Sequence, residues 1–110
     1  MRPKTIRVVH KLPQFPAEIS IVPNTLESLQ KFVGGSICGI YLDDVANVGD
    51  IGGYCDDEGL LKGLPLNFYL RGEPIVGPVV FSNVDHEGEE IGLTELQAEL
   101  LCRFLEAVTL

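Results

Sequence analysis

Residues 5–21 of the chain read TIRVVHKLPQFPAEISI, and this stretch decides the fold class. Residues 5–10 are rich in β-branched side chains, which predicts a β-strand. Residues 11–16 contain two prolines, which cannot donate to a strand ladder, so we expect a loop there. Residues 17–21 then alternate apolar and polar side chains, as a half-buried strand does. The stretch therefore predicts two strands that pair antiparallel.

Two helices are expected further along the chain. The first covers residues 24–33, where Asn24 is placed to cap the N-terminus and Gly34 to end the helix. The second covers residues 94–108, and Thr94–Gln97 has the spacing of a capping box. Both segments repeat apolar side chains at three- and four-residue intervals, which is typical of amphipathic helices.

The remaining sequence predicts more strands than helices. Extended segments are expected at residues 36–42, 45–48, 54–55 and 75–81. Residues 49–53 hold three glycines, which indicates a flexible connection or a bulged strand. Pro78 within the last segment implies a sheet edge or a bulge. Residues 60–69 are apolar but irregular, because Pro65 argues against a helix there.

This order of elements has too few alternating β-α units for a doubly wound parallel sheet. We therefore expect a single α+β domain over residues 1–110, with a mainly antiparallel sheet. One short helix and one longer, amphipathic C-terminal helix are expected to pack on one face of that sheet. The 45% apolar and 22% charged residues are enough for a modest core.

The charge distribution disfavours several classes of partner. The formal net charge is −8, and the acidic residues gather in residues 43–58 and 85–99. Nucleic-acid binders usually carry a net basic face, so DNA or RNA binding is not expected. No apolar run approaches the roughly 18 residues of a membrane-spanning helix, so membrane insertion is not expected either.

The three cysteines are Cys38, Cys55 and Cys102, an odd number without a CxxC pair. A disulfide framework and a zinc site would both need paired cysteines, so we expect reduced thiols, no metal and no cofactor. This use of cysteine predicts a cytoplasmic protein.

The residue types that carry catalysis are scattered. The chain has no glycine-rich phosphate loop, and His10 and His86 have no serine or cysteine beside them in the sequence. Asp43, Asp44 and the acids of residues 56–58 offer oxygen ligands of the kind that divalent cations take, but without the EF-hand spacing. No catalytic residue is therefore predicted.

Residues 63–67, GLPLN, form the most distinctive segment. One interpretation is a rigid loop that lines a groove, with Asn67 as a ligand or a backbone anchor. The alternative is a buried connection whose leucines plug the sheet and whose Asn67 caps a turn. The candidate binding residues are Gly63, Leu64, Pro65, Leu66 and Asn67, together with Asp43 and Asp44.

The C-terminal helix has an apolar arc of about 180°, wider than the ~100° that one sheet face requires. The surplus could pack under a loop or form a contact between subunits, so the chain is a possible homodimer. The residues expected in such a self-association contact are Leu101, Phe104, Leu105 and Val108.

Several segments resemble one family of small phage, plasmid and bacterial proteins, catalogued as domain of unknown function 3846. The resemblance rests on residues 25–35, 41–44 and 57–67, and extends to residues 75–77 and 93–97. It implies a cytoplasmic protein of mobile elements or their hosts and carries no established activity. Pro78 and the glycine-rich residues 49–53 depart from the family pattern.

These observations predict a non-enzymatic binding module of a phage or mobile element that acts on a host protein or a small metabolite. The alternatives are a small enzyme that uses its acidic loops with a divalent metal, and a structural subunit of a larger assembly.

Overall fold

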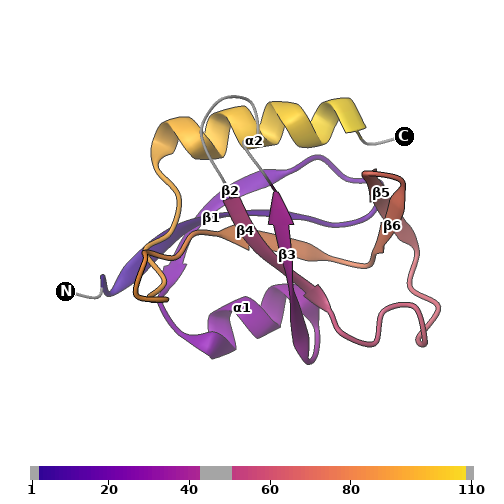
Figure 1. The fold of residues 1–110 in the computed structure, drawn as a ribbon, viewed down its shortest axis with the longest axis horizontal. Helices are drawn as coiled ribbons and strands as arrows, with labels where there is room; N and C mark the ends of the chain where they lie inside the picture. Colours follow the sequence, from indigo (N-terminus) through magenta and orange to yellow (C-terminus); the bar gives the residue numbers. More distant parts are fainter. Residues whose placement is uncertain (1–2, 43–50, 109–110) are drawn as a thin grey trace.

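The structure, a computed structural model, describes residues 3–42 and 51–108. Within these ranges the chain forms seven strands and two helices, arranged as Figure 1 shows. The elements are β1 (Thr5–Lys11), β2 (Glu18–Pro23), α1 (Leu26–Val33), β3 (Ile37–Leu42), β4 (Ile51–Asp56), β5 (Leu66–Leu70), β6 (Glu73–Val76), β7 (Val79–Ser82) and α2 (Glu95–Val108). Neither helix in the described part of the chain has the length and apolar character needed to cross a membrane.

The main sheet has five strands in the order β2-β1-β7-β4-β3, and every neighbouring pair is antiparallel. Strands β5 and β6 form a separate antiparallel hairpin. The predicted α+β class with a mainly antiparallel sheet and a longer C-terminal helix is therefore confirmed.

The two helices lie on opposite faces of the sheet, with α2 above it and α1 below it in Figure 1. The expectation that both would pack on one face is wrong. Side chains of neighbouring strand residues point to opposite faces, and both Val8 and Val9 are fully buried. Val8 packs with Leu29 and Val33 of α1, whereas Val9 packs in the core beneath α2. Burial of both faces gives three layers.

The core beneath α2 is the larger of the two. It joins residues of β1, β7 and the helix to the β5–β6 hairpin, and its buried members are Val9, Leu42, Ile51, Phe68, Val79, Phe81, Leu93, Ala98, Leu101 and Leu105. The hairpin therefore packs against the core that α2 covers, and its strand β6 lies beside β4.

The segment predicted as one strand over residues 75–81 is two strands in different sheets. β6 ends at Val76 and β7 begins at Val79, and Gly77 between them has φ +74°, a conformation that favours glycine. Pro78 therefore lies at the junction between the strands. β7 is the central strand of the main sheet and not an edge.

Close packing between β4 and β7 explains one glycine of the glycine-rich stretch. Residues 51–56 form β4, and a Cβ at Gly53 would lie 2.6 Å from Cδ1 of Phe81 on the neighbouring strand. Glycine therefore lets the Phe81 ring lie against the backbone of β4. The strand predicted at residues 45–48 lies outside the described residues.

The helix caps confirm one prediction and correct another. Thr94 and Gln97 form the predicted capping box, with Thr94 N donating to Gln97 Oε1 and Gln97 N donating to Thr94 Oγ1. Helix α1 is capped by Thr25, whose side chain accepts from Ser28 N, and not by Asn24. The Asn24 amide instead donates to the carbonyl oxygens of Pro3 and Glu90.

Candidate functional site

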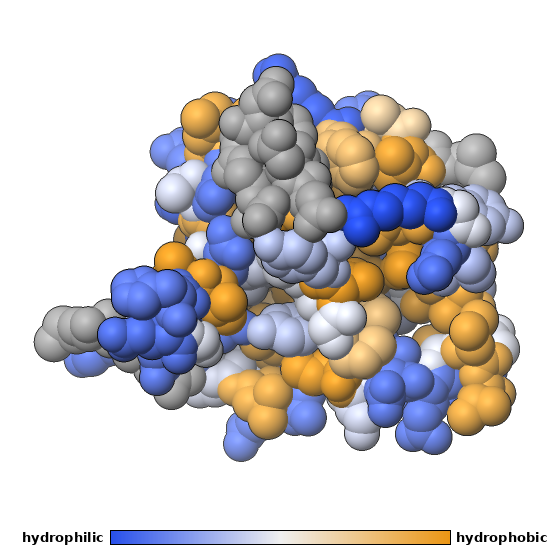
Figure 2. All heavy atoms as spheres, viewed as in Figure 1, coloured by the Kyte–Doolittle hydropathy of each residue, from blue (hydrophilic) through white to orange (hydrophobic). Residues whose placement is uncertain are grey.

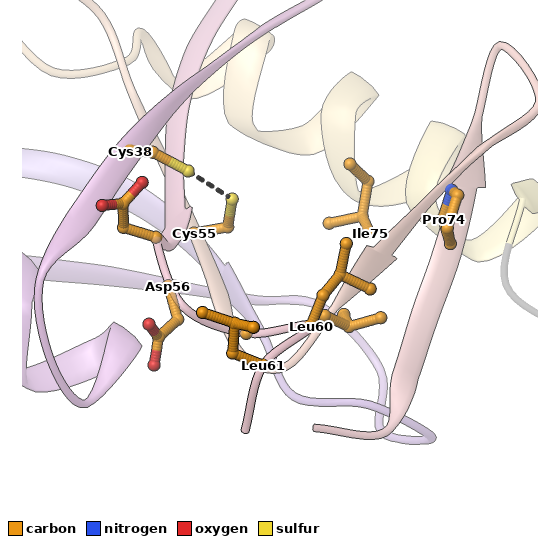
Figure 3. Close-up of a pocket in the computed structure, with 10 residues that line it drawn as sticks. Cys38, Cys55, Asp56, Leu60, Leu61, Pro74 and Ile75 are labelled. Atoms are coloured by element: carbon orange, nitrogen blue, oxygen red, sulfur yellow. Dashed lines mark hydrogen bonds between the residues drawn. The ribbon is translucent and has the colours of Figure 1, made fainter. Parts of the chain in front are cut away.

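A groove of about 420 Å³ opens between the end of β4, the connection that follows it and strand β6. Cys38 and Cys55 lie on one side of the groove, and Pro74 and Ile75 on the other (Figure 3). The complete lining is Cys38, Cys55, Asp56, Asp57, Gly59, Leu60, Leu61, Pro74, Ile75 and Val76. Most of these side chains are apolar, which is typical of a binding surface.

The wall of the groove is a turn over residues 57–63, which we call the Leu60–Leu61 turn. Asp56 holds this turn in place: its Oδ1 accepts from Glu58 N at 2.8 Å, and its Oδ2 accepts from Lys62 Nζ at 2.7 Å. The hydrogen bond from Lys62 lowers the pKa of Asp56 below its usual value, and the bond from Glu58 N acts in the same direction. Both oxygens of this buried carboxylate are thus engaged within the protein.

Two leucines of the turn project into solvent. Leu60 is 73% exposed and Leu61 is 87% exposed. Figure 2 shows hydrophobic residues at the surface in this part of the molecule, at the lower right where Figure 1 places the connection between β4 and β5. Asp56 and Lys62 flank the two leucines in the sequence, and their contact fixes the turn. The folded turn itself therefore holds Leu60 and Leu61 in exposed positions.

The inner end of the groove carries two thiols. Cys38 and Cys55 are directly opposite each other on β3 and β4, and their sulfur atoms are 3.2 Å apart. Burial raises the pKa of Cys55 to about 12, and a hydrogen bond to Cys38 adds to the increase. The sequence placed these cysteines 17 residues apart, and the pairing of β3 with β4 was needed to bring them together.

The GLPLN segment does not line the groove. Asn67 is 4% exposed: its Nδ2 donates to the carbonyl oxygens of Lys11 and Gly77, and its Oδ1 accepts from Lys11 Nζ at 2.6 Å. Leu64 lies over Gly77, and a Cβ there would be 2.6 Å from Leu64 Cδ1. Asn67 therefore joins β5 to β1 and to the β6–β7 junction, so it anchors the backbone inside the fold.

The other residues of this segment are less buried than Asn67. Gly63 has φ +68° at the end of the Leu60–Leu61 turn, Pro65 is exposed, and Leu66 starts β5 half-buried. The partner of Asn67, Lys11, is 2% exposed, and burial lowers the pKa of its amine. No sequence pattern marks this lysine as buried, because lysine is seldom buried without a charged partner.

The C-terminal helix uses most of its apolar arc inside the subunit. Leu101 and Leu105 are fully buried beneath it, and Phe104 and Val108 are half-buried against the same core. The sheet and the β5–β6 hairpin already cover Leu101 and Leu105, so of these four residues only Phe104 and Val108 keep exposed surface, and a contact with a second copy stays a prediction for them.

The acidic residues that the alternative of a divalent-metal enzyme would use are not assembled into a site in the described part of the chain. Asp43 and Asp44 lie outside the described residues, and Asp56 is engaged by Lys62. Over residues 3–42 and 51–108, no group of three histidine, cysteine or acidic side chains is arranged to hold a metal ion.

Neither histidine is among the residues that line the groove. His10 Nε2 lies 2.8 Å from Ser20 Oγ, and its ring stacks on Phe32 at 4.5 Å. The side chain of His86 is 90% exposed.

A cluster of polar side chains lies on the face of the sheet that α1 covers. Glu90 accepts hydrogen bonds from the hydroxyl groups of Tyr54 and Ser82, so one acid of the 85–99 run points into the fold. Burial, followed by the contact with Glu90, raises the pKa of Tyr54. The neighbouring hollow measures about 190 Å³ and lies between α1 and β4. Its small size makes the groove beside β6 the stronger candidate for a binding site.

Comparisons with known proteins identify the family. Searches of curated proteins and of solved structures found no match. The family model described as Domain of unknown function (DUF3846) matches residues 5–108, nearly the whole chain. The predicted resemblance is thereby confirmed, and the chain belongs to this family of unknown function.

Proposed function

We propose that the chain is a non-enzymatic binding module that holds an apolar segment of a partner protein in the groove beside β6. The observation that carries this proposal is the exposure of Leu60 and Leu61, at 73% and 87%, on a turn that hydrogen bonds hold in place. A secured turn that presents two leucines leaves apolar area for a partner to bury, at roughly 25 cal/mol for each Å².

The shape of the site favours a protein partner over a small metabolite. A small-molecule site buries most of its ligand, whereas here two leucines stand beside an open groove of about 420 Å³. In such an arrangement an apolar side chain of the partner enters the groove while Leu60 and Leu61 pack against the partner's surface. This reciprocal contact is the form that binding hot spots take.

The charges at the rim indicate what surrounds the apolar segment of the partner. Asp57 and Glu58 are exposed beside the groove, while Lys62 is engaged with Asp56. The rim is therefore acidic, and the chain as a whole carries a net charge of −8. A partner segment with basic residues on either side of its apolar side chains would match this potential and associate faster.

The wider setting belongs to the same proposal. The partner is a host protein, and the chain acts in the cytoplasm as part of a phage or other mobile element. Binding of a small metabolite, self-association and a divalent-metal enzyme are the competing outcomes that the experiment distinguishes.

The proposal is tested by affinity capture from cells of the natural host with three purified proteins. These are the wild type, a double variant with Leu60→Asp and Leu61→Asp, and Leu96→Asp as the control. Leu96 is a 60% exposed leucine on α2, outside the groove lining. A captured protein is then purified and titrated by calorimetry against all three.

We expect the double variant to lose at least about tenfold in affinity, because it places charges in the apolar contact, while the control binds as the wild type does. Equal binding by all three proteins, or heat only on titration with magnesium, manganese or calcium, would overturn the proposal. If light scattering shows a dimer that the double variant abolishes, the partner in the groove is a second copy of the chain and not a host protein.

A further inference from the structure

Two of the three cysteines form a dithiol across adjacent strands. Cys38 of β3 and Cys55 of β4 are register partners, and opposed residues in an antiparallel pair have Cα atoms about 4.5–5.5 Å apart. That range falls within the Cα separation that disulfides span. The two sulfur atoms already lie 3.2 Å apart, so a bond of about 2.05 Å needs only a small rotation of the side chains.

From this geometry we infer that Cys38 and Cys55 are a thiol-modification site that forms a reversible disulfide within the chain. The oxidant is a low-molecular-weight disulfide of the oxidised-glutathione class, which reaches the sulfur atoms through the groove. Both cysteines are partly exposed and line the groove. The inference does not depend on what else the groove binds.

The environment of the two thiols determines the order of the steps. The two thiols share a hydrogen bond in which either sulfur can be the donor, and burial raises the pKa of Cys55 and keeps it protonated. Because the thiolate is the nucleophile and burial keeps Cys55 protonated, we assign the first attack to Cys38. Its sulfur attacks one sulfur of the oxidant, which forms a mixed disulfide and releases one thiolate that takes up the Cys38 proton.

The second step closes the bond within the protein. Cys55 loses its proton, and its sulfur attacks the sulfur of Cys38 in the mixed disulfide. This releases the second small thiol, which carries the Cys55 proton away. Two protein thiols are oxidised and one small disulfide is reduced to two thiols, so atoms and electrons balance without another reactant.

The disulfide would secure a strand at the end of the sheet. β3 pairs with β4 on one side and ends the strand order in the described part of the sheet. A covalent bond between the two strands closes the loop over residues 38–55 and restricts the unfolded chain. It also changes the inner end of the groove, where both sulfur atoms lie.

The experiment is a titration of the purified wild type with mixtures of reduced and oxidised glutathione. Free thiols are then trapped by alkylation, and the intact mass is measured. We expect the wild type to lose two of its three alkylation sites, with peptide mapping that joins Cys38 to Cys55. The oxidised protein should melt at a temperature roughly 10 °C or more above that of the reduced protein.

Three single variants give the inference its controls. Cys102→Ser should form the same disulfide as the wild type. Cys55→Ser should accumulate a glutathione adduct on Cys38, because the resolving thiol is gone, whereas Cys38→Ser should form several-fold less adduct on Cys55. Three free thiols in the folded wild type at every ratio, with oxidation only after unfolding in urea, would overturn the inference. A disulfide that includes Cys102 would overturn it as well.

Discussion

Helix α2 and the Leu60–Leu61 turn are both rich in leucine, but the fold treats them in opposite ways. In α2, Leu101 and Leu105 are fully buried, and the partly buried Phe104 extends the same core. In the turn, Leu60 and Leu61 are the two most exposed large apolar residues in the described part of the chain. The helix has the stronger apolar pattern in the sequence, yet the turn exposes more apolar side-chain surface to solvent at its leucines.

The difference arises from what lies opposite each segment. Helix α2 rests on the main sheet and on the β5–β6 hairpin, so Phe68 of β5 covers a part of the arc that a flat sheet would leave open. The turn at residues 57–63 is anchored through Asp56 and borders the groove, and no described element covers Leu60 and Leu61. An apolar arc on a helix therefore predicts an interface poorly unless the surface opposite it is known.

The largest expected effect is on the helix side of this comparison. Leu101→Ala should lower the free energy of unfolding by about 2–5 kcal/mol, because it leaves a cavity in a fully buried core. Leu96→Ala on the same helix should change it by less than about 0.5 kcal/mol, since Leu96 is 60% exposed. Urea denaturation measures both values. Similar effects for the two variants would mean that α2 is not packed as described.

The next effect concerns Asn67, the buried end of the connection that starts with the exposed turn. Asn67→Ala should destabilise the protein by about 2–3 kcal/mol, because it removes the hydrogen bonds of this side chain to the buried Lys11 amine and to two buried carbonyl groups. Asn67→Asp should also destabilise it, since a carboxylate accepts from Lys11 but cannot donate to the carbonyl oxygens. A neutral result for both variants in thermal unfolding would contradict the structural role.

A smaller, pH-dependent effect is expected where the turn is held. The pKa of Asp56 is lowered in the folded state, so its ionised form stabilises the fold above its unfolded pKa of about 4. This contribution is lost as the pH falls through the lower, folded pKa. Asp56→Asn should therefore have a lower Tm than the wild type at pH 7, and the difference should shrink below pH 4. A difference that stays constant between pH 7 and pH 3 would contradict the assignment.

The smallest effect on stability is expected at the surface of the turn. Leu61→Asp should change the free energy of unfolding by less than about 0.5 kcal/mol, because the side chain is 87% exposed. Calorimetric unfolding beside Leu96→Asp provides the matched comparison. A loss above about 1 kcal/mol for Leu61→Asp alone would show that the leucine packs within the subunit.

The fold prediction rests on sequence patterns that span only a few residues. The strand at residues 5–10, the helix at 94–108 and its Thr94–Gln97 capping box followed from spacing and propensity. The two-sided sheet was missed, although Val8-Val9 and residues 79–81 are unbroken apolar runs rather than alternating ones. Such runs are the signal for strands that are buried on both faces.

The candidate site was harder to predict, because it depends on contacts between distant segments. The sequence marks Asn67 as the polar end of a distinctive segment, but its partner Lys11 is 56 residues away. Cys38 and Cys55 were considered as separate thiols, since only the register of β3 and β4 places them opposite each other. The exposure of Leu60 and Leu61 depends on how residues 57–63 turn, and leucine by itself predicts burial.

The measurement that tests the central claim most directly is site-specific photo-crosslinking in host cells. A photoreactive amino acid is placed at position 61 in one sample and at position 96 in another, so that two exposed leucine positions are compared. The account predicts a covalent adduct with one host protein at position 61 and none at position 96. Adducts at position 96 alone, or no adduct at either position, would contradict it.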